Sequence, residues 1–134
     1  MTDADTKLRG RRILVIEDDY LLAQVLIDFL EEAGAEIVGP IGWVEEALAA
    51  IDNGEINVDA AVLDVNLHGA KSYPIADALA ERSVPFVFAT GYGSDALDAS
   101  YLDHPRCEKP FDQSMLVALL NDILSKKCTA GMRT

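Results

Sequence analysis

The stretch Ile13-Leu14-Val15-Ile16-Glu17-Asp18-Asp19 decides the fold of this 134-residue chain. Its four consecutive apolar side chains predict a strand that is covered on both faces, as in a parallel sheet. Three carboxylates follow that strand directly. A helix is predicted next, because apolar residues recur at steps of three and four and Gly34 then ends the pattern. The members of this stripe are Leu22, Val25, Leu26, Phe29, Leu30 and Ala33.

The alternation of strand and helix repeats along the chain. We predict further strands over residues 36–38, 60–63 and 85–89 and a short one near 106–107, with Gly39-Pro40 closing the second strand. Helices are predicted over 44–51, 72–82 and, after the cap Asp112, 116–124, with one or two helical turns within 94–100. Five strand-then-helix units predict an α/β fold, a doubly wound five-stranded parallel sheet with helices on both faces.

The composition excludes several classes of function. Asp and Glu outnumber Lys and Arg by 23 to 11, so the formal net charge is −12, and an acidic chain is a poor partner for nucleic acid or for anionic membrane. Two cysteines cannot build a disulfide framework. The beginning of the chain lacks the apolar region of a signal peptide, and no apolar run reaches the ~20 residues that a membrane span needs. We therefore predict a cytoplasmic protein.

Polar side chains stand at the ends of four of the predicted strands. Glu17 and Asp18 end the first strand and Asp64 the third, while Thr90 ends the fourth and Lys109 the fifth. Since ligands of such folds gather at the carboxyl ends of the strands, we expect these side chains to meet there. A single acidic residue after a strand is usually a helix cap or a solvated residue. Three clustered carboxylates repel one another unless a cation lies among them, and oxygen-only ligation is typical of Mg²⁺.

This set of residue types suits phosphoryl transfer, which depends mainly on positioning and charge neutralisation. Asp64 could act as a nucleophile that accepts a phosphoryl group. The metal and Lys109 would neutralise the phosphoryl oxygens, and Thr90 would donate a hydrogen bond to one of them.

Four motifs together resemble a known family. Val15-Ile16-Glu17-Asp18-Asp19, Leu63-Asp64-Val65-Asn66, Ala89-Thr90-Gly91 and Glu108-Lys109-Pro110 are similar to the strand ends of response regulator receiver domains in bacterial two-component signalling. The resemblance covers nearly the whole chain. It implies a flavodoxin-like sheet with strand order 2-1-3-4-5.

The resemblance also implies a role for each residue of the set. Asp64 would be the phosphorylation site, Thr90 the switch hydroxyl and Lys109 the amine that contacts the phosphoryl group. The Mg²⁺ ligands would be Glu17, Asp18, Asp64 and the backbone carbonyl of Asn66, with Asp18 a direct ligand.

Phe88-Ala89-Thr90-Gly91-Tyr92-Gly93 is similar to a subgroup of receivers with a Phe-Ala-Thr-Gly signature, many of which stand alone. Three positions depart from the commoner family pattern: Arg106 replaces an aromatic residue, Gly91 an alanine and His68 a proline. Because Arg106 and Gly91 put the usual switching in doubt, we predict that residues 91–100 reorder on phosphorylation. His68 is interpreted as a solvated loop residue, His104 as a turn residue and Trp43 as a packing residue.

For the chain as a whole we predict a flexible lead-in over 1–10, a receiver domain over 11–126 and a frayed tail over 127–134, without an output domain. Expected partners are a sensor histidine kinase or histidine phosphotransfer protein and a downstream protein target, with the chain a monomer or weak dimer. The signal would pass through the partner, or the chain would serve as a phosphate shuttle or sink.

The alternative function is that of an enzyme, a Mg²⁺-dependent phosphohydrolase with an aspartyl-phosphate intermediate. Phosphatases of the haloacid dehalogenase type place a second Asp two residues after the nucleophile as a general acid and base. That position is Asn66 here, and an amide cannot transfer protons.

Overall fold

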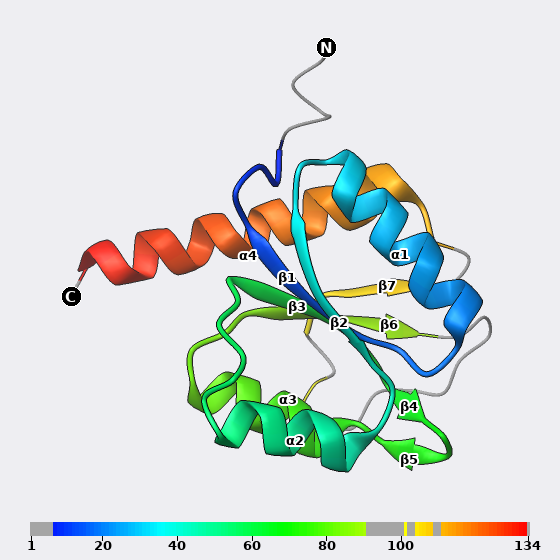
Figure 1. Ribbon diagram of the computed structural model, residues 1–134. Helices are drawn as coiled ribbons and strands as arrows, with labels where there is room; N and C mark the ends of the chain where they lie inside the picture. Colours follow the sequence, from blue (N-terminus) through cyan, green and yellow to red (C-terminus); the bar gives the residue numbers. More distant parts are fainter. Residues whose placement is uncertain (1–6, 91–100, 102–103, 109–110, 134) are drawn as a thin grey trace.

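A five-stranded parallel sheet forms the centre of the computed structural model (Figure 1), which describes residues 7–90, 101, 104–108 and 111–133. Its strands lie in the order β2-β1-β3-β6-β7. They are β1 (Arg12–Ile16), β2 (Glu36–Ile41), β3 (Ala60–Asp64), β6 (Phe86–Thr90) and β7 (Arg106–Glu108). Counted among the sheet strands alone, this is the predicted order 2-1-3-4-5. The flavodoxin-like α/β fold is therefore confirmed.

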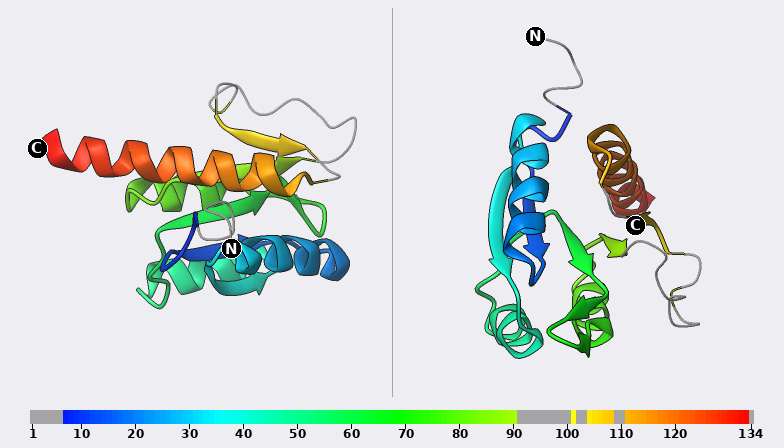
Figure 2. Two further views of the ribbon diagram at one scale, coloured as in Figure 1. Left: turned by 90° about the horizontal axis from the view of Figure 1, so that it is seen from above. Right: turned by 90° about the vertical axis from the view of Figure 1, so that its right-hand side faces the viewer.

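Helices cover both faces of the sheet, as predicted. Figures 1 and 2 show α1 (Tyr20–Glu32) and α4 (Gln113–Arg133) on one face, and α2 (Val44–Asp52) and α3 (Tyr73–Glu81) on the other. The pleat of β1 sends Ile13 and Val15 into the core beneath α1 and α4, and Leu14 and Ile16 into the core beneath α2 and α3. The buried side chains of β1 are apolar, and the buried polar side chains of β3 and β6, Asp64 and Thr90, stand at the last position of each strand.

The second strand is longer than predicted. β2 continues through Gly39 and Pro40 to Ile41, with a shift of register against β1 after Leu14. An edge strand tolerates proline because its missing N–H faces away from the sheet. Gly39 has φ +105°, and a Cβ there would lie 2.7 Å from the carbonyl oxygen of Val15. The glycine is thus required by this close approach, and does not close the strand.

Leu8 lies in the segment predicted to be a flexible lead-in, yet its side chain is fully buried. Its backbone N–H donates to the carbonyl of Ala33, and its carbonyl accepts from the N–H of Arg11. The side chain belongs to the core cluster beneath α1 and α4. The described part of this lead-in, residues 7–10, therefore contributes to the packed structure.

Two further elements lie outside the predicted pattern. β4 (Asn66–Leu67) and β5 (Ala70–Lys71) pair as an antiparallel hairpin directly after β3. The helical backbone of α4 continues to Arg133, through most of the residues predicted as a frayed tail. Within the described residues, no helix has the length and apolar content that a membrane crossing requires.

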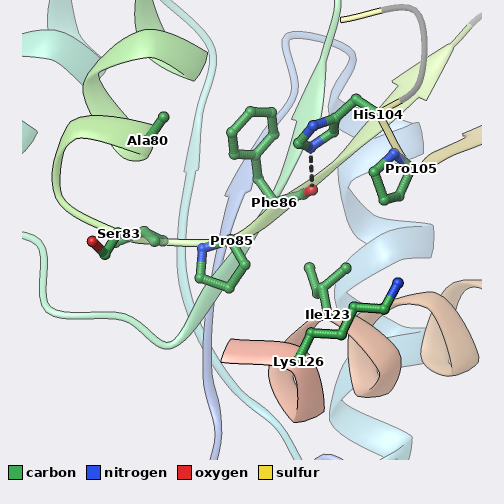
Figure 3. Close-up of a pocket in the computed structure, with 9 residues that line it drawn as sticks. Ala80, Ser83, Pro85, Phe86, His104, Pro105, Ile123 and Lys126 are labelled. Carbon is green, nitrogen blue, oxygen red and sulfur yellow. Dashed lines mark hydrogen bonds between the residues drawn. The ribbon is translucent and has the colours of Figure 1, made fainter. Parts of the chain in front are cut away.

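His104 belongs to a cluster of rings beside β6 and is more than a turn residue. Its imidazole stacks on Phe86 with ring centroids 4.2 Å apart, and its Nε2 donates to the carbonyl oxygen of Phe86 at 2.7 Å (Figure 3). Tyr101 contacts the same cluster and donates a hydrogen bond from its hydroxyl to Asp77 of α3. These contacts attach Tyr101 and His104 to β6 and α3.

We expect His104 to make stability dependent on pH. Burial lowers the pKa of His104 below its ordinary value of 6.5, and the bond to the Phe86 carbonyl offsets this only in part. The unfolded chain therefore takes up a proton at higher pH than the folded chain does. His104 adds stability above pH 6.5, and this is lost as the pH falls through the lowered folded value. Denaturant unfolding of the wild type and of His104→Gln from pH 7.5 to 5 would measure this contribution to stability. The difference between their free energies of unfolding should change within that pH range. A difference that stays constant with pH would contradict the expectation.

Candidate functional site

The carboxyl edge of the sheet brings together three of the predicted carboxylates. Glu17 directly follows β1, Asp18 comes next, and Asp64 is the last residue of β3. One carboxylate oxygen of each lies within 4.8 Å of the other two. Since β1 and β3 are neighbours in parallel register, the close approach follows from the fold. The predicted cluster is therefore present in the structure.

The cluster lies at the boundary between core and solvent. Glu17 and Asp64 are 3% and 6% exposed, while Asp18 is partly exposed. Backbone amides orient the two buried carboxylates: Asp19 N–H donates to Oε2 of Glu17, and Asn66 N–H donates to Oδ1 of Asp64. Asp19 in turn caps α1, since its Oδ1 accepts from the N–H groups of Leu21 and Leu22. The acidic pair is thus Glu17 and Asp18, and Asp19 belongs to the helix.

Asp18 accepts a hydrogen bond from a residue that is distant in the sequence. Its Oδ2 accepts a hydrogen bond of 2.8 Å from the backbone N–H of His68, in the turn between β4 and β5. Burial raises the pKa of Asp18, but hydrogen bonds, foremost that from His68 N–H, outweigh it and leave the pKa below its ordinary value. Asp18 is therefore stabilised as a carboxylate, the form that binds a cation.

Thr90 is the last residue of β6, the strand next to β3. Its side chain is 2% exposed, and its Oγ1 lacks a hydrogen-bond partner within the described part of the chain. In the register of the two strands, Asp64 lies opposite Ala89, the residue before Thr90. A buried hydroxyl without a partner beside Asp64 is costly unless a ligand accepts from it.

The structure describes the other two predicted residues only in part. Asn66 is exposed in β4, and the ligation of a metal by its backbone carbonyl stays a prediction. Lys109 comes directly after β7 but lies outside the described residues, as does the segment 91–100 that we predict to reorder. Arg106 is exposed on β7.

The residues present fit a divalent cation. Three carboxylates whose oxygens lie within 4.8 Å offer the hard oxygen ligands that Mg²⁺ prefers, and the partial exposure of Asp18 leaves room for water in the coordination shell. The hollow drawn in Figure 3 is a different feature: Pro85 and Phe86 line it at the opposite end of β6 from Thr90. The acidic cluster is therefore the candidate site.

Sequence reasoning missed the hairpin and what it does at the site. His68 lies exposed as predicted, but its imidazole stacks on the ring of Trp43, with centroids 3.6 Å apart and planes 11° apart. Trp43 itself is 51% exposed, so its packing partner is this imidazole at the surface. The sequence signal for a tight hairpin turn was the pair His68-Gly69. In the structure both residues have positive φ.

Comparisons with known proteins agree with this fold. No family model matches the chain. The solution structure of SdrG from Sphingomonas melonis Fr1 is 41% identical, with a TM-score of 0.75 over 92% of this chain and 99% of that one. The BeF₃-activated conformation of SdrG from Pseudomonas melonis Fr1 is 45% identical, with a TM-score of 0.70 over 84% of this chain and 95% of that one.

A curated relative is the transcriptional regulatory protein PdtaR of Mycobacterium tuberculosis, 30% identical over 93% of this chain. The match spans 62% of PdtaR's length. Together with the sheet order and the acidic cluster at its carboxyl edge, the similarity to SdrG over almost the whole length of both chains shows the family. The chain belongs to the receiver domains of response regulators in two-component signalling.

Proposed function

We propose that this chain accepts a phosphoryl group on Asp64 from a sensor histidine kinase or a histidine phosphotransfer protein. The observation that carries the proposal is the clustering of the Glu17, Asp18 and Asp64 carboxylates within 4.8 Å of one another, at the edge of the sheet where β6 ends in the buried Thr90. An oxygen of the Asp64 carboxylate attacks phosphorus, the bond from phosphorus to the histidine nitrogen breaks, and its electron pair returns to the imidazole.

Each residue of the site has a separate role in this transfer. Asn66 N–H donates to Oδ1 of Asp64 and so orients the carboxylate that attacks. Thr90 donates its hydroxyl to a phosphoryl oxygen, and Lys109 neutralises charge on another. Mg²⁺, held by Glu17, Asp18, Asp64 and the carbonyl of Asn66, would supply the remaining charge neutralisation.

The output of the proposed transfer is a changed surface. The acyl phosphate on Asp64 carries about two negative charges where the carboxylate carried one, so the cluster of three carboxylates gains about one further charge and a bulky group with acceptor oxygens. We propose that a downstream protein reads this surface, or that the chain passes the group on as a shuttle or sink, in the cytoplasm and as a monomer or weak dimer. Membership of the Phe-Ala-Thr-Gly subgroup stays part of this proposal.

The phosphohydrolase alternative is not supported. Asn66 lies two residues after Asp64 with its backbone N–H bonded to Oδ1 of Asp64, and its amide side chain cannot act as a general acid or base. The similarity to SdrG favours the phosphoacceptor role.

The deciding experiment is intact mass spectrometry of the whole chain after incubation with acetyl phosphate. We expect the gain of one phosphoryl group that requires Mg²⁺, is lost on treatment with hydroxylamine and is absent in Asp64→Asn. The control Asp28→Asn, an exposed position in the middle of α1, should gain the group as the wild type does. If neither acetyl phosphate nor a phosphorylated histidine donor gives the gain, or if Asp64→Asn shows it too, the proposal is wrong.

A further inference from the structure

The β4–β5 hairpin is built to place one backbone amide over the acidic cluster. Its two-residue turn consists of His68 with φ 50° and Gly69 with φ 83°. Positive φ at both central residues is the conformation of a type I′ turn, which matches the twist of the two paired strands. The turn directs the N–H of His68 at Oδ2 of Asp18, 50 residues away in the sequence.

A second contact fixes the side chain of His68. The imidazole of His68 lies nearly parallel to the ring of Trp43, the residue before α2, at 3.6 Å between centroids. The β4–β5 ladder itself is short, since it pairs only two residues on each strand. The ring stack therefore connects the hairpin to the β2–α2 loop, and the amide connects it to the β1–α1 loop.

From these two contacts we infer that His68 and Trp43 are positioning residues for the metal site, acting through Asp18. The inference rests on the proposed function. A carboxylate that binds Mg²⁺ through one oxygen leaves its other oxygen to accept a hydrogen bond, and that bond sets the rotation of the group. His68 N–H bonds to Oδ2 of Asp18, and this bond fixes the rotation of a carboxylate that has one oxygen within 4.8 Å of those of Glu17 and Asp64. The ring stack keeps the N–H in place.

The residue type at position 68 permits this arrangement. A proline, which stands there in the commoner family pattern, has no N–H to donate and cannot adopt positive φ. Histidine is among the few residues other than glycine that are enriched in the left-handed region, and it adds a ring that can stack. The departure from the family pattern at His68 thus provides a contact to Asp18 that a proline would exclude.

An opposite role for the same contacts would be a lid that must open before the cation binds. The two roles predict opposite signs. If the hairpin orients Asp18, then releasing it weakens Mg²⁺ binding, because the carboxylate must be ordered at the moment of binding. If the hairpin blocks the site, releasing it strengthens binding.

The test is isothermal calorimetry of Mg²⁺ binding to the full chain and its variants. We expect Trp43→Ala to weaken the affinity roughly tenfold, the lower end of the effect of removing a group that orients a metal ligand. Trp43→Phe keeps a ring for His68 to stack on and should restore most of the affinity. His68→Asn keeps the N–H and suits the turn but removes the ring, so it should resemble Trp43→Ala.

A matched control and a second readout separate positioning from general damage. Tyr20→Ala removes another exposed ring near the site, one without a stacking partner in the described part of the chain, and should leave the affinity unchanged. The amide proton resonance of His68 in the wild type should show a hydrogen-bonded shift that is lost in Trp43→Ala and recovered in Trp43→Phe. A general loss of packing would not show this pattern of rescue.

The outcomes distinguish this inference from the proposed function. Equal or tighter Mg²⁺ binding in Trp43→Ala and His68→Asn would overturn the positioning role, while phosphorylation of Asp64 in the mass assay would still stand. A wild type that binds no Mg²⁺ would overturn both.

Discussion

Asp64→Asn is expected to unfold at a higher temperature than the wild type when no divalent cation is present. Asp64 is 6% exposed and lies with Glu17 and Asp18 in a cluster whose carboxylate oxygens come within 4.8 Å of one another. Removing one of three like charges from this site relieves repulsion of about 1 to 3 kcal/mol. The amide keeps an Oδ1 that can accept from Asn66 N–H, so the substitution leaves that contact possible.

Addition of Mg²⁺ should abolish or reverse this difference in unfolding temperature between Asp64→Asn and the wild type. A cation at a hundredfold excess over its dissociation constant stabilises the wild type by about 2.7 kcal/mol. Asp64→Asn loses a ligand and should show little response. Thermal unfolding of both proteins with EDTA and with a Mg²⁺ series measures both effects in one experiment.

The control for charge alone is again Asp28→Asn, which lies outside the cluster on the exposed side of α1. It should leave both the stability without metal and the response to Mg²⁺ close to those of the wild type. If Asp64→Asn is instead less stable than the wild type in EDTA, the three carboxylates do not repel one another in the way that the geometry indicates.

Leu8→Ala is expected to lower the free energy of unfolding by about 2 to 5 kcal/mol, the range for truncating a fully buried leucine. The side chain is 0% exposed and lies in the cluster beneath α1 and α4. Its loss leaves a cavity that the surrounding strands and helices cannot fill without moving. Urea unfolding followed by circular dichroism gives the free energy.

Lys7→Ala is the matched control, since Lys7 is the exposed neighbour of Leu8. An exposed substitution of this kind should change stability by less than about 0.5 kcal/mol. If both variants fall within that range, residues 7–10 behave as the lead-in that the sequence predicts, and the packing of Leu8 contributes little.

The parallel sheet and its site could be predicted because they depend on strong local signals. Ile13 to Ile16 form a continuous apolar run that ends in carboxylates, and β-strands of this kind have few alternatives. The parallel topology then places the ends of β1, β3 and β6 at one edge, so Glu17, Asp18, Asp64 and Thr90 are brought together by the fold alone.

The features that were missed depend on contacts between distant segments. Leu8 is one apolar residue in a polar stretch, and its burial follows from Ala33 and the helices around it. The β4–β5 hairpin has strands of two residues, too short for any alternating pattern to show. Its turn residues His68 and Gly69 gave a weak signal, and the stack on Trp43 joins two loops that only the folded sheet brings together.

The two core clusters described above differ in how much of the chain each requires. All the buried residues of the cluster beneath α2 and α3 have been made once Phe88 is added, whereas the cluster beneath α1 and α4 joins Leu8 to Leu116, Leu120 and Leu124. Because a chain leaves the ribosome from its amino end, one face of the sheet can pack during synthesis while the other must wait for the last helix. Until that helix emerges, the apolar face of α1 and Leu8 stay exposed, and this is the stage at which a nascent chain would depend most on chaperones.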